Sequence, residues 1–190
     1  MTRARLSGRL VLAVTAGAVL VGTIGTIHFT QPAWYERFRY PLHYEEIVRG
    51  HARNYRLDPA LLAAVIYQES KFHADARSDR GAVGLMQLLP ATAEGIAART
   101  GGARFVASDL YDPEINVRYG AWYLRHLLDK YGSEQLALAA YNAGQANVDR
   151  WLARRLPIQF AETRDFVDRV ERLKRTYHHA YASLRQQTDT

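Results

Sequence analysis

The chain has 190 residues, of which 48% are apolar and 23% charged, and its formal net charge is +6. This length allows one globular domain plus an appendage, and the composition excludes a wholly disordered or collagen-like chain. The absence of cysteine excludes a disulfide scaffold, a thiolate zinc site and a cysteine nucleophile. Arg3, Arg5 and Arg9 supply half of the net charge, so the remaining chain is only mildly basic and no nucleic-acid partner is expected.

A long apolar segment follows these arginines. From Leu10 to Phe29 there is no Asp, Glu, Lys or Arg, and 20 helical residues extend roughly 30 Å, the thickness of a bilayer core. The arginines before the segment favour a cytoplasmic N-terminus, which places the rest of the chain on the extracytoplasmic side. The segment therefore predicts a single-pass anchor in the cell membrane. A cleaved signal peptide, which would give a secreted protein, is the alternative.

The rest of the chain has the caps and the periodicity of helices, without sustained alternation of apolar and polar residues. The segment 78–88, which contains two glycines, is expected to form a loop or a small hairpin. We predict five helices from their capping and breaking residues. One begins at Asp58-Pro59, and the others run from Pro90 to just before Gly101, from Asp112-Pro113 to Gly132, from Ser133 to Gly144, and from about Glu162 to Tyr181. The pattern predicts an all-α globular domain.

The first of these helices carries an acid among its apolar residues. On a helical wheel that sets Leu61 at zero, Glu69 lies at about 80°, between Val65 and Leu62 on the apolar arc. Loss of hydration there would raise the pKa of the Glu69 carboxyl, and a carboxyl group that stays protonated near neutral pH can act as a general acid. A glutamate paired with an arginine beneath the core is the structural alternative.

Four ordered sequence blocks bear on this alternative. They are Glu69-Ser70-Lys71-Phe72, Ser78 with Gly81-Ala82-Val83-Gly84-Leu85-Met86-Gln87, Ala140-Tyr141-Asn142-Ala143-Gly144, and Glu162-Thr163-Arg164-Asp165-Phe166-Val167. Together they resemble the motifs of the soluble lytic transglycosylase family, over about residues 40–177. The resemblance implies a lysozyme-like, mostly helical fold. It also implies a lyase that cleaves the MurNAc–GlcNAc β-1,4 bonds of peptidoglycan without water and leaves 1,6-anhydro-MurNAc ends.

The resemblance assigns the catalytic role to Glu69, first as general acid and then as base. Most glycosidases need two carboxylates, but one suffices here because the nucleophile, the C6 hydroxyl, belongs to the substrate. By the same resemblance, substrate-binding positions fall on Ser78, Met86, Gln87, Tyr141, Asn142 and Glu162. Each of them has a structural alternative, such as a loop cap for the serine, core packing for the methionine and tyrosine, and a helix N-terminal acid for Glu162.

No metal or other cofactor is expected, because His178-His179 has no third ligand at a zinc-binding spacing. Trp122, Tyr123 and Trp151 are expected mainly in the core, with sugar stacking as the alternative. The expected partners are peptidoglycan glycan strands, the membrane and, as an open possibility, proteins of an envelope machine.

The expected division of the chain is a basic flank and anchor at 1–30, a linker at 31–44, a catalytic domain at 45–181 and a tail at 182–190. Three rivals stay open at this point. They are a catalytically silent peptidoglycan-binding module, a scaffold subunit of a secretion machine, and a hydrolytic muramidase with the same fold and acid.

Overall fold

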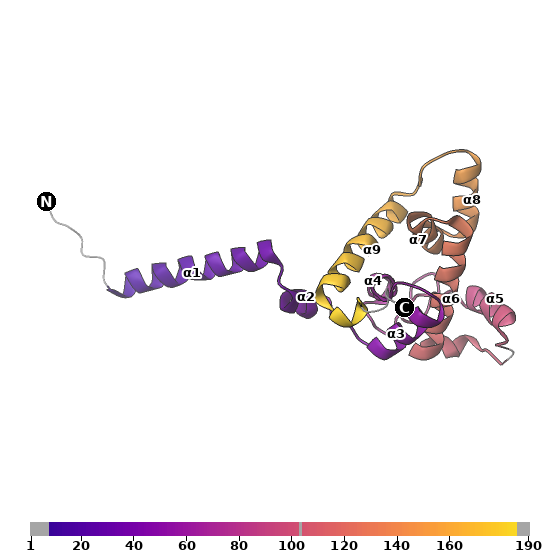
Figure 1. Cartoon of the computed structure of the whole chain (residues 1–190), viewed down its shortest axis with the longest axis horizontal. Helices are drawn as coiled ribbons and strands as arrows, with labels where there is room; N and C mark the ends of the chain where they lie inside the picture. The colour runs from indigo at the N-terminus through magenta and orange to yellow at the C-terminus, as the bar shows by residue number, and fades with distance from the viewer. Residues whose placement is uncertain (1–7, 103, 186–190) are drawn as a thin grey trace.

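The computed structural model describes residues 8–102 and 104–185, and the described chain is almost entirely helical (Figure 1). Within those ranges the only β-structure consists of isolated bridges between residues 77 and 83 and between 83 and 88. The all-α prediction is therefore confirmed. The helices are α1 (Gly8–Thr30), α2 (Ala33–Arg39), α3 (Glu45–Asn54), α4 (Pro59–Ser70), α5 (Pro90–Thr100), η1 (Ala107–Tyr111), α6 (Pro113–Tyr131), α7 (Glu134–Ala143), α8 (Gln145–Ala153), α9 (Ala161–Ala180) and η2 (Ala182–Leu184).

The predicted helix starts are formed by side-chain caps. The Asp58 carboxylate accepts the backbone N–H of Ala60 at the start of α4, and Asp112 accepts two N–H groups at the start of α6. Ser133 caps α7 in the same way. At the other end of α6, Gly132 has φ +61°, the left-handed conformation that ends a helix at low cost for glycine. These caps confirm the predicted boundaries to within a residue or two.

The main core surrounds α4, whose residues from Pro59 to Ile66 are all buried. Helix α9 packs along α4, and α3, α6 and α7 complete the cluster. A second, smaller core lies between α5, η1 and α6 and contains Leu88, Ile96, Leu110 and Tyr119. The segment between α4 and α5 contributes residues to both cores. Because this segment follows α4 directly, the contacts that hold its backbone in place also hold the C-terminal end of α4.

Asn116 of α6 holds the backbone of that segment in place through hydrogen bonds. Its buried side chain accepts the N–H of Met86 at 2.8 Å and donates to the carbonyls of Val83 at 2.9 Å and Leu110 at 2.8 Å. Gly84 (φ +80°) makes this approach possible, because a Cβ there would lie 2.1 Å from the Asn116 amide nitrogen. The segment 78–88, expected as a loop or a small hairpin, is thus a loop with isolated β-bridges, and the side-chain amide of Asn116 holds it in place.

Helix α1 projects away from the globule (Figure 1). The residues of α1 whose burial is described are exposed, except Gly25, which is partly buried. The basic flank predicted at the N-terminus lies in residues 1–7, outside the described residues. Within the described residues, no helix is both long enough and apolar enough to cross a membrane.

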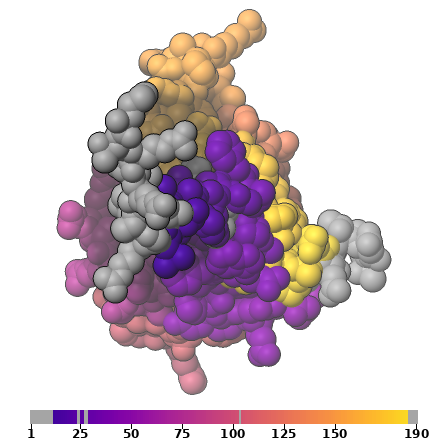
Figure 2. All heavy atoms as spheres, turned by 90° about the vertical axis from the view of Figure 1, so that its left-hand side faces the viewer, coloured from indigo at the N-terminus to yellow at the C-terminus, as the bar shows by residue number. Residues whose placement is uncertain are grey.

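Residues 31–44, expected as a linker, contain α2 and contact the globule beside α9 (Figure 2). Arg37 donates to the carbonyl of Ala180 at 2.6 Å. The Tyr181 hydroxyl accepts the backbone N–H of Leu42 at 2.9 Å and donates to the carbonyl of Tyr40 at 3.0 Å. This part of the chain is therefore packed rather than extended.

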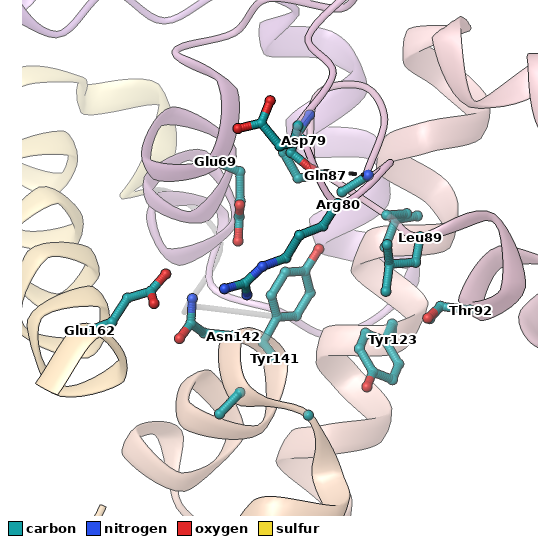
Figure 3. Close-up of a pocket in the computed structure, with 15 residues that line it drawn as sticks. Glu69, Asp79, Arg80, Gln87, Leu89, Thr92, Tyr123, Tyr141, Asn142 and Glu162 are labelled. Atoms are coloured by element: carbon teal, nitrogen blue, oxygen red, sulfur yellow. Dashed lines mark hydrogen bonds between the residues drawn. The ribbon is translucent and has the colours of Figure 1, made fainter. Parts of the chain in front are cut away.

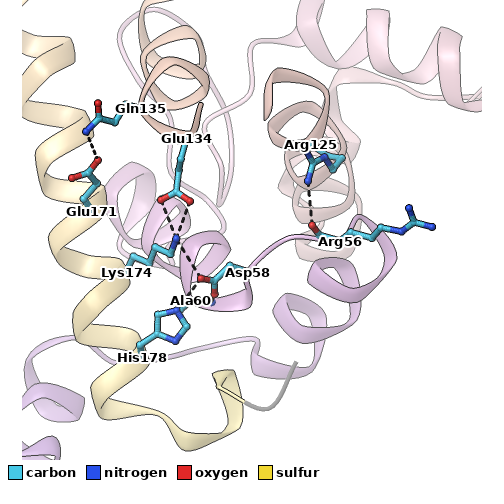
Figure 4. Close-up of polar contacts among 9 residues, drawn as sticks. All are labelled: Arg56, Asp58, Ala60, Arg125, Glu134, Gln135, Glu171, Lys174 and His178. Atoms are coloured by element: carbon cyan, nitrogen blue, oxygen red, sulfur yellow. Dashed lines mark hydrogen bonds and ion pairs between the residues drawn. The ribbon is translucent and has the colours of Figure 1, made fainter. Parts of the chain in front are cut away.

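A polar cluster joins the starts of α4 and α7 to α9 (Figure 4). Lys174 donates to both oxygens of Glu134 and lies 3.4 Å from the carboxylate of Asp58, which also contacts His178 at 2.8 Å. The neighbouring His179 pairs separately with Glu36. The two histidines thus belong to separate ion pairs, and no cluster of metal-ligating side chains occurs in residues 8–102 and 104–185.

Candidate active site

A cleft of about 600 Å³ opens where the end of α4, the 78–89 segment, α7 and the start of α9 converge (Figure 3). A second hollow of about 630 Å³ continues on the far side of Glu69 and shares the Glu69, Ser78 and Gln87 walls. Glu69 therefore lies where two open hollows meet. The predicted site residues that line the cleft are Glu69, Ser78, Gln87, Tyr141, Asn142 and Glu162.

Glu69 lies in the last turn of α4 and is half-buried. Burial raises the pKa of its carboxyl to about 8, from the ordinary value of 4.5. None of the basic side chains in the described parts of the chain forms an ion pair with it, so the arginine-paired alternative has no support there. The predicted rise in pKa is confirmed, and the group is protonated at neutral pH.

Tyr141 stands beside this carboxyl, as Figure 3 shows. Its hydroxyl donates to the backbone carbonyl of Met86 at 2.7 Å, which leaves the phenol oxygen able to accept a hydrogen bond from the cleft. Burial, then Glu69 and then Tyr123 raise the pKa of Tyr141 well above its ordinary value, so the phenol stays neutral. Its direction is fixed because the Met86 backbone is held by Asn116.

Ser78 and Gln87 each combine a structural contact with a place on the cleft wall. The Ser78 hydroxyl accepts the N–H of Ala82 at 3.0 Å, which makes it the loop cap that the structural alternative expected. The Gln87 amide nitrogen donates to the carbonyls of Ala76 and Gly84, and its amide oxygen is left as an acceptor for a substrate N–H.

Met86 is placed differently from the prediction that it lines the groove. Its side chain is fully buried and packs so closely on α6 that a Cβ at Gly120 would lie 2.2 Å from the methionine sulfur. Only its backbone carbonyl reaches the site, through the hydroxyl of Tyr141. The structure supports the core-packing alternative for the side chain.

Asn142 and Glu162 form the wall opposite Glu69. The amide oxygen of Asn142 accepts the hydroxyl of the buried Thr163 at 2.8 Å, so its NH₂ group is the end turned to the cleft. Glu162 is exposed in the first turn of α9 and points into the cleft (Figure 3).

Nine of the lining residues were not among the predicted site residues, and the polar ones are Asp79, Arg80, Thr92 and Tyr123. The aromatic pair Trp122-Tyr123 gave a signal for the last of them, although both residues were expected mainly in the core. Trp151 is buried in the core as expected. Arg80 gave no signal, because its place depends on the turn that carries it.

The fold and the site together define a class of protein. A helical domain with an open cleft, a protonated carboxyl at its centre and amide and hydroxyl groups on its walls is suited to acid-catalysed cleavage of a polar polymer. The family model described as Transglycosylase SLT domain matches residues 46–159, which is more than half of the chain. The chain therefore belongs to the transglycosylase SLT domain family and has its lysozyme-like, mostly helical fold.

Individual relatives agree with this assignment. The chain is 40% identical to a transglycosylase of Enterobacteria phage PRD1 over 108 residues, which are 56% of this chain and 37% of that protein. It is 31% identical to the soluble lytic murein transglycosylase of Salmonella typhimurium over 153 residues, 74% of this chain and 24% of the relative. The chain thus spans less than two fifths of these curated relatives.

Solved structures match over a larger share of the chain. An inactive mutant of the lytic transglycosylase Slt from Pseudomonas aeruginosa gives a TM-score of 0.72 at 32% identity, over 84% of this chain and 28% of that one. The 70 kDa soluble lytic transglycosylase of Escherichia coli gives 0.70 at 29% identity, over 76% of this chain and 25% of that one.

Proposed function

We propose that this chain is a peptidoglycan lytic transglycosylase that cleaves MurNAc–GlcNAc β-1,4 bonds and leaves 1,6-anhydro-MurNAc ends. The observation that carries the proposal is the Glu69 carboxyl, which lies in the open cleft with its pKa raised to about 8. An acid with a pKa close to neutral pH can both give and retake a proton within one catalytic cycle. Family membership supports the substrate class.

In the proposed first step, Glu69 donates its proton to the glycosidic oxygen, and the bond to the MurNAc anomeric carbon breaks. The oxocarbenium-like centre is supported by the N-acetyl group of the same sugar. In the second step the ionised Glu69 takes the proton of the C6 hydroxyl while that oxygen bonds to the anomeric carbon. The proton count returns to its starting value, and no water is consumed.

The other wall residues position the substrate in this proposal. Tyr141 is a positioning residue that keeps a neutral hydroxyl beside Glu69, held in place by its bond to Met86. The Gln87 amide oxygen offers an acceptor for a sugar amide N–H, and the Asn142 NH₂ group is a donor on the opposite wall. Ser78 and Glu162 complete the walls, at the loop and at α9 respectively.

Attachment to the cell membrane is a second part of the proposal, with residues 1–30 as flank and anchor and the domain at 45–181 on the extracytoplasmic side. Its support is the run from Leu10 to Phe29 without a charged side chain and the arginines before it. Several residues of the run have side chains outside the described set. Cell fractionation with N-terminal sequencing separates a retained anchor from a cleaved signal and secretion.

The activity is tested by digesting purified peptidoglycan with the full chain in mild detergent and identifying the products by mass spectrometry. Glu69→Gln is the test variant, and Glu94→Gln, an exposed glutamate of α5, is the matched control. We expect anhydro-ended muropeptides from the parent and the control, and none from Glu69→Gln. Reducing ends would identify a hydrolytic muramidase. Intact wall binding without any product would identify a binding or scaffold module.

A further inference from the structure

Arg80 stands at the tip of a tight turn in the cleft wall. The N–H of Gly81 bonds to the carbonyl of Ser78 at 2.9 Å, and the N–H of Ala82 bonds to the Ser78 hydroxyl, so Asp79 and Arg80 are the two central residues. Gly81, with φ +78°, closes the turn in a conformation that favours glycine. This turn gives the long arginine side chain a defined starting point over the cleft.

The two tip residues point in different directions. In Figure 3 the Arg80 guanidinium reaches into the cleft toward Asn142, whereas the carboxylate of Asp79, which also lines the cleft, is turned away from Asn142. Arg80 is exposed, and no carboxylate among the described residues forms an ion pair with it. The cleft therefore contains a positive charge that is not paired with any described carboxylate and is available to a ligand.

The side-chain NH₂ group of Asn142 is a second hydrogen-bond donor in the part of the cleft that the Arg80 guanidinium enters. The Asn142 amide oxygen is occupied by the hydroxyl of buried Thr163, which turns the NH₂ group toward the guanidinium of Arg80 (Figure 3). A guanidinium and an amide N–H that line one cleft can each donate a hydrogen bond to an oxygen of a carboxylate. Glu162 lines the same cleft from the α9 side, next to Asn142 (Figure 3).

We propose that Arg80 and the Asn142 amide bind a carboxylate of the substrate, and that this contact distinguishes peptidoglycan from β-1,4-linked GlcNAc polymers, which carry none. The inference rests on the proposed function for its substrate class. The carboxylate has two sources, the lactyl group of a MurNAc without a peptide and the stem peptide. Glu69 does not repel it, because burial keeps the Glu69 carboxyl protonated below about pH 8.

The test measures binding by the full chain in mild detergent, in the inactive Glu69→Gln background, by calorimetry. Three tetrasaccharides are the probes: chitotetraose, a stem-free GlcNAc–MurNAc tetramer, and the same tetramer with stem peptides. We expect Arg80→Ala to weaken the binding of a carboxylate-bearing probe about tenfold. Chitotetraose binding is expected to stay unchanged. Arg53→Ala, an exposed arginine of α3 that lines neither hollow, is the matched control.

The probes separate the two sources of the carboxylate. A loss on the stem-free tetramer identifies the lactyl carboxylate, and a loss confined to the stem-bearing tetramer identifies the peptide. Equal weakening of all three probes, or of none, would overturn the inference while leaving the proposed function standing. If the Glu69→Gln chain binds none of the three, the proposed function and this inference both fail.

Discussion

Replacing Glu69 by glutamine should make the protein more stable at neutral pH, although it removes the proposed catalytic group. The unfolded chain loses the Glu69 proton near the ordinary pKa of 4.5, whereas the folded protein retains it up to about pH 8, because burial disfavours the charged form. Between these two values the folded state holds one proton more than the unfolded state. Rising pH therefore favours unfolding.

The size of the effect follows from this interval. Each pH unit between the two pKa values lowers the free energy of unfolding by about 1.4 kcal/mol. The loss reaches about 3 kcal/mol by pH 7 and about 5 kcal/mol at pH 8, and it stays constant above that. Below pH 4.5 both states are protonated and the penalty vanishes. Glutamine has a similar shape and no charge, so the variant escapes the penalty at every pH.

Urea unfolding of parent and Glu69→Gln, followed by tryptophan fluorescence in the same mild detergent, measures the difference. We expect similar midpoints at pH 4 and a growing advantage of the variant from pH 5 to pH 8. Glu94→Gln, which removes an exposed carboxylate, should show no such growth. Equal pH dependence of the two glutamine variants would refute the reasoning, because it would mean that Glu69 ionises normally.

Three further changes probe the support of the site. Tyr141→Phe leaves the buried Met86 carbonyl without its donor and should cost about 1–2 kcal/mol in urea unfolding, with a loss of wall-cleaving activity. Asn116→Ala removes three buried hydrogen bonds and should cost at least about 3 kcal/mol; a smaller cost would mean that water replaces the amide. Gly120→Ala forces the Met86 side chain to move and should cost about 1–3 kcal/mol, whereas Gly50→Ala, which meets nothing within 4 Å, should not destabilise the protein.

Much of the fold follows from local chemistry in the sequence. Asp58, Asp112 and Ser133 precede helices as capping residues, and Gly132 ends one, because these interactions involve only neighbouring residues. Glu69 could be located in the same way, since two helical turns are enough to place it among apolar residues. The helical wheel predicts only one buried face for α4. In the structure all residues from Pro59 to Ile66 are buried, because α3 and α9 and other parts of the core pack around this helix.

Features that depend on tertiary packing were not predictable from the sequence. The three bonds of Asn116 join segments up to 33 residues apart, and nothing near Asn116 in the chain indicates them. The position of Met86 depends on the absence of a side chain at Gly120, on another helix. The docking of α2 on α9 likewise depends on residues about 140 positions apart, such as Tyr40 and Tyr181.

The central claim is that Glu69 directs the substrate's own C6 hydroxyl rather than water to the anomeric carbon. Digestion of peptidoglycan by the full chain in water enriched in a heavy oxygen isotope tests it most directly, with mass spectrometry of the released ends. We predict anhydro-MurNAc ends without label from the parent and no new ends from Glu69→Gln. Reducing ends that carry the label would contradict the account, because they would show that water is the nucleophile.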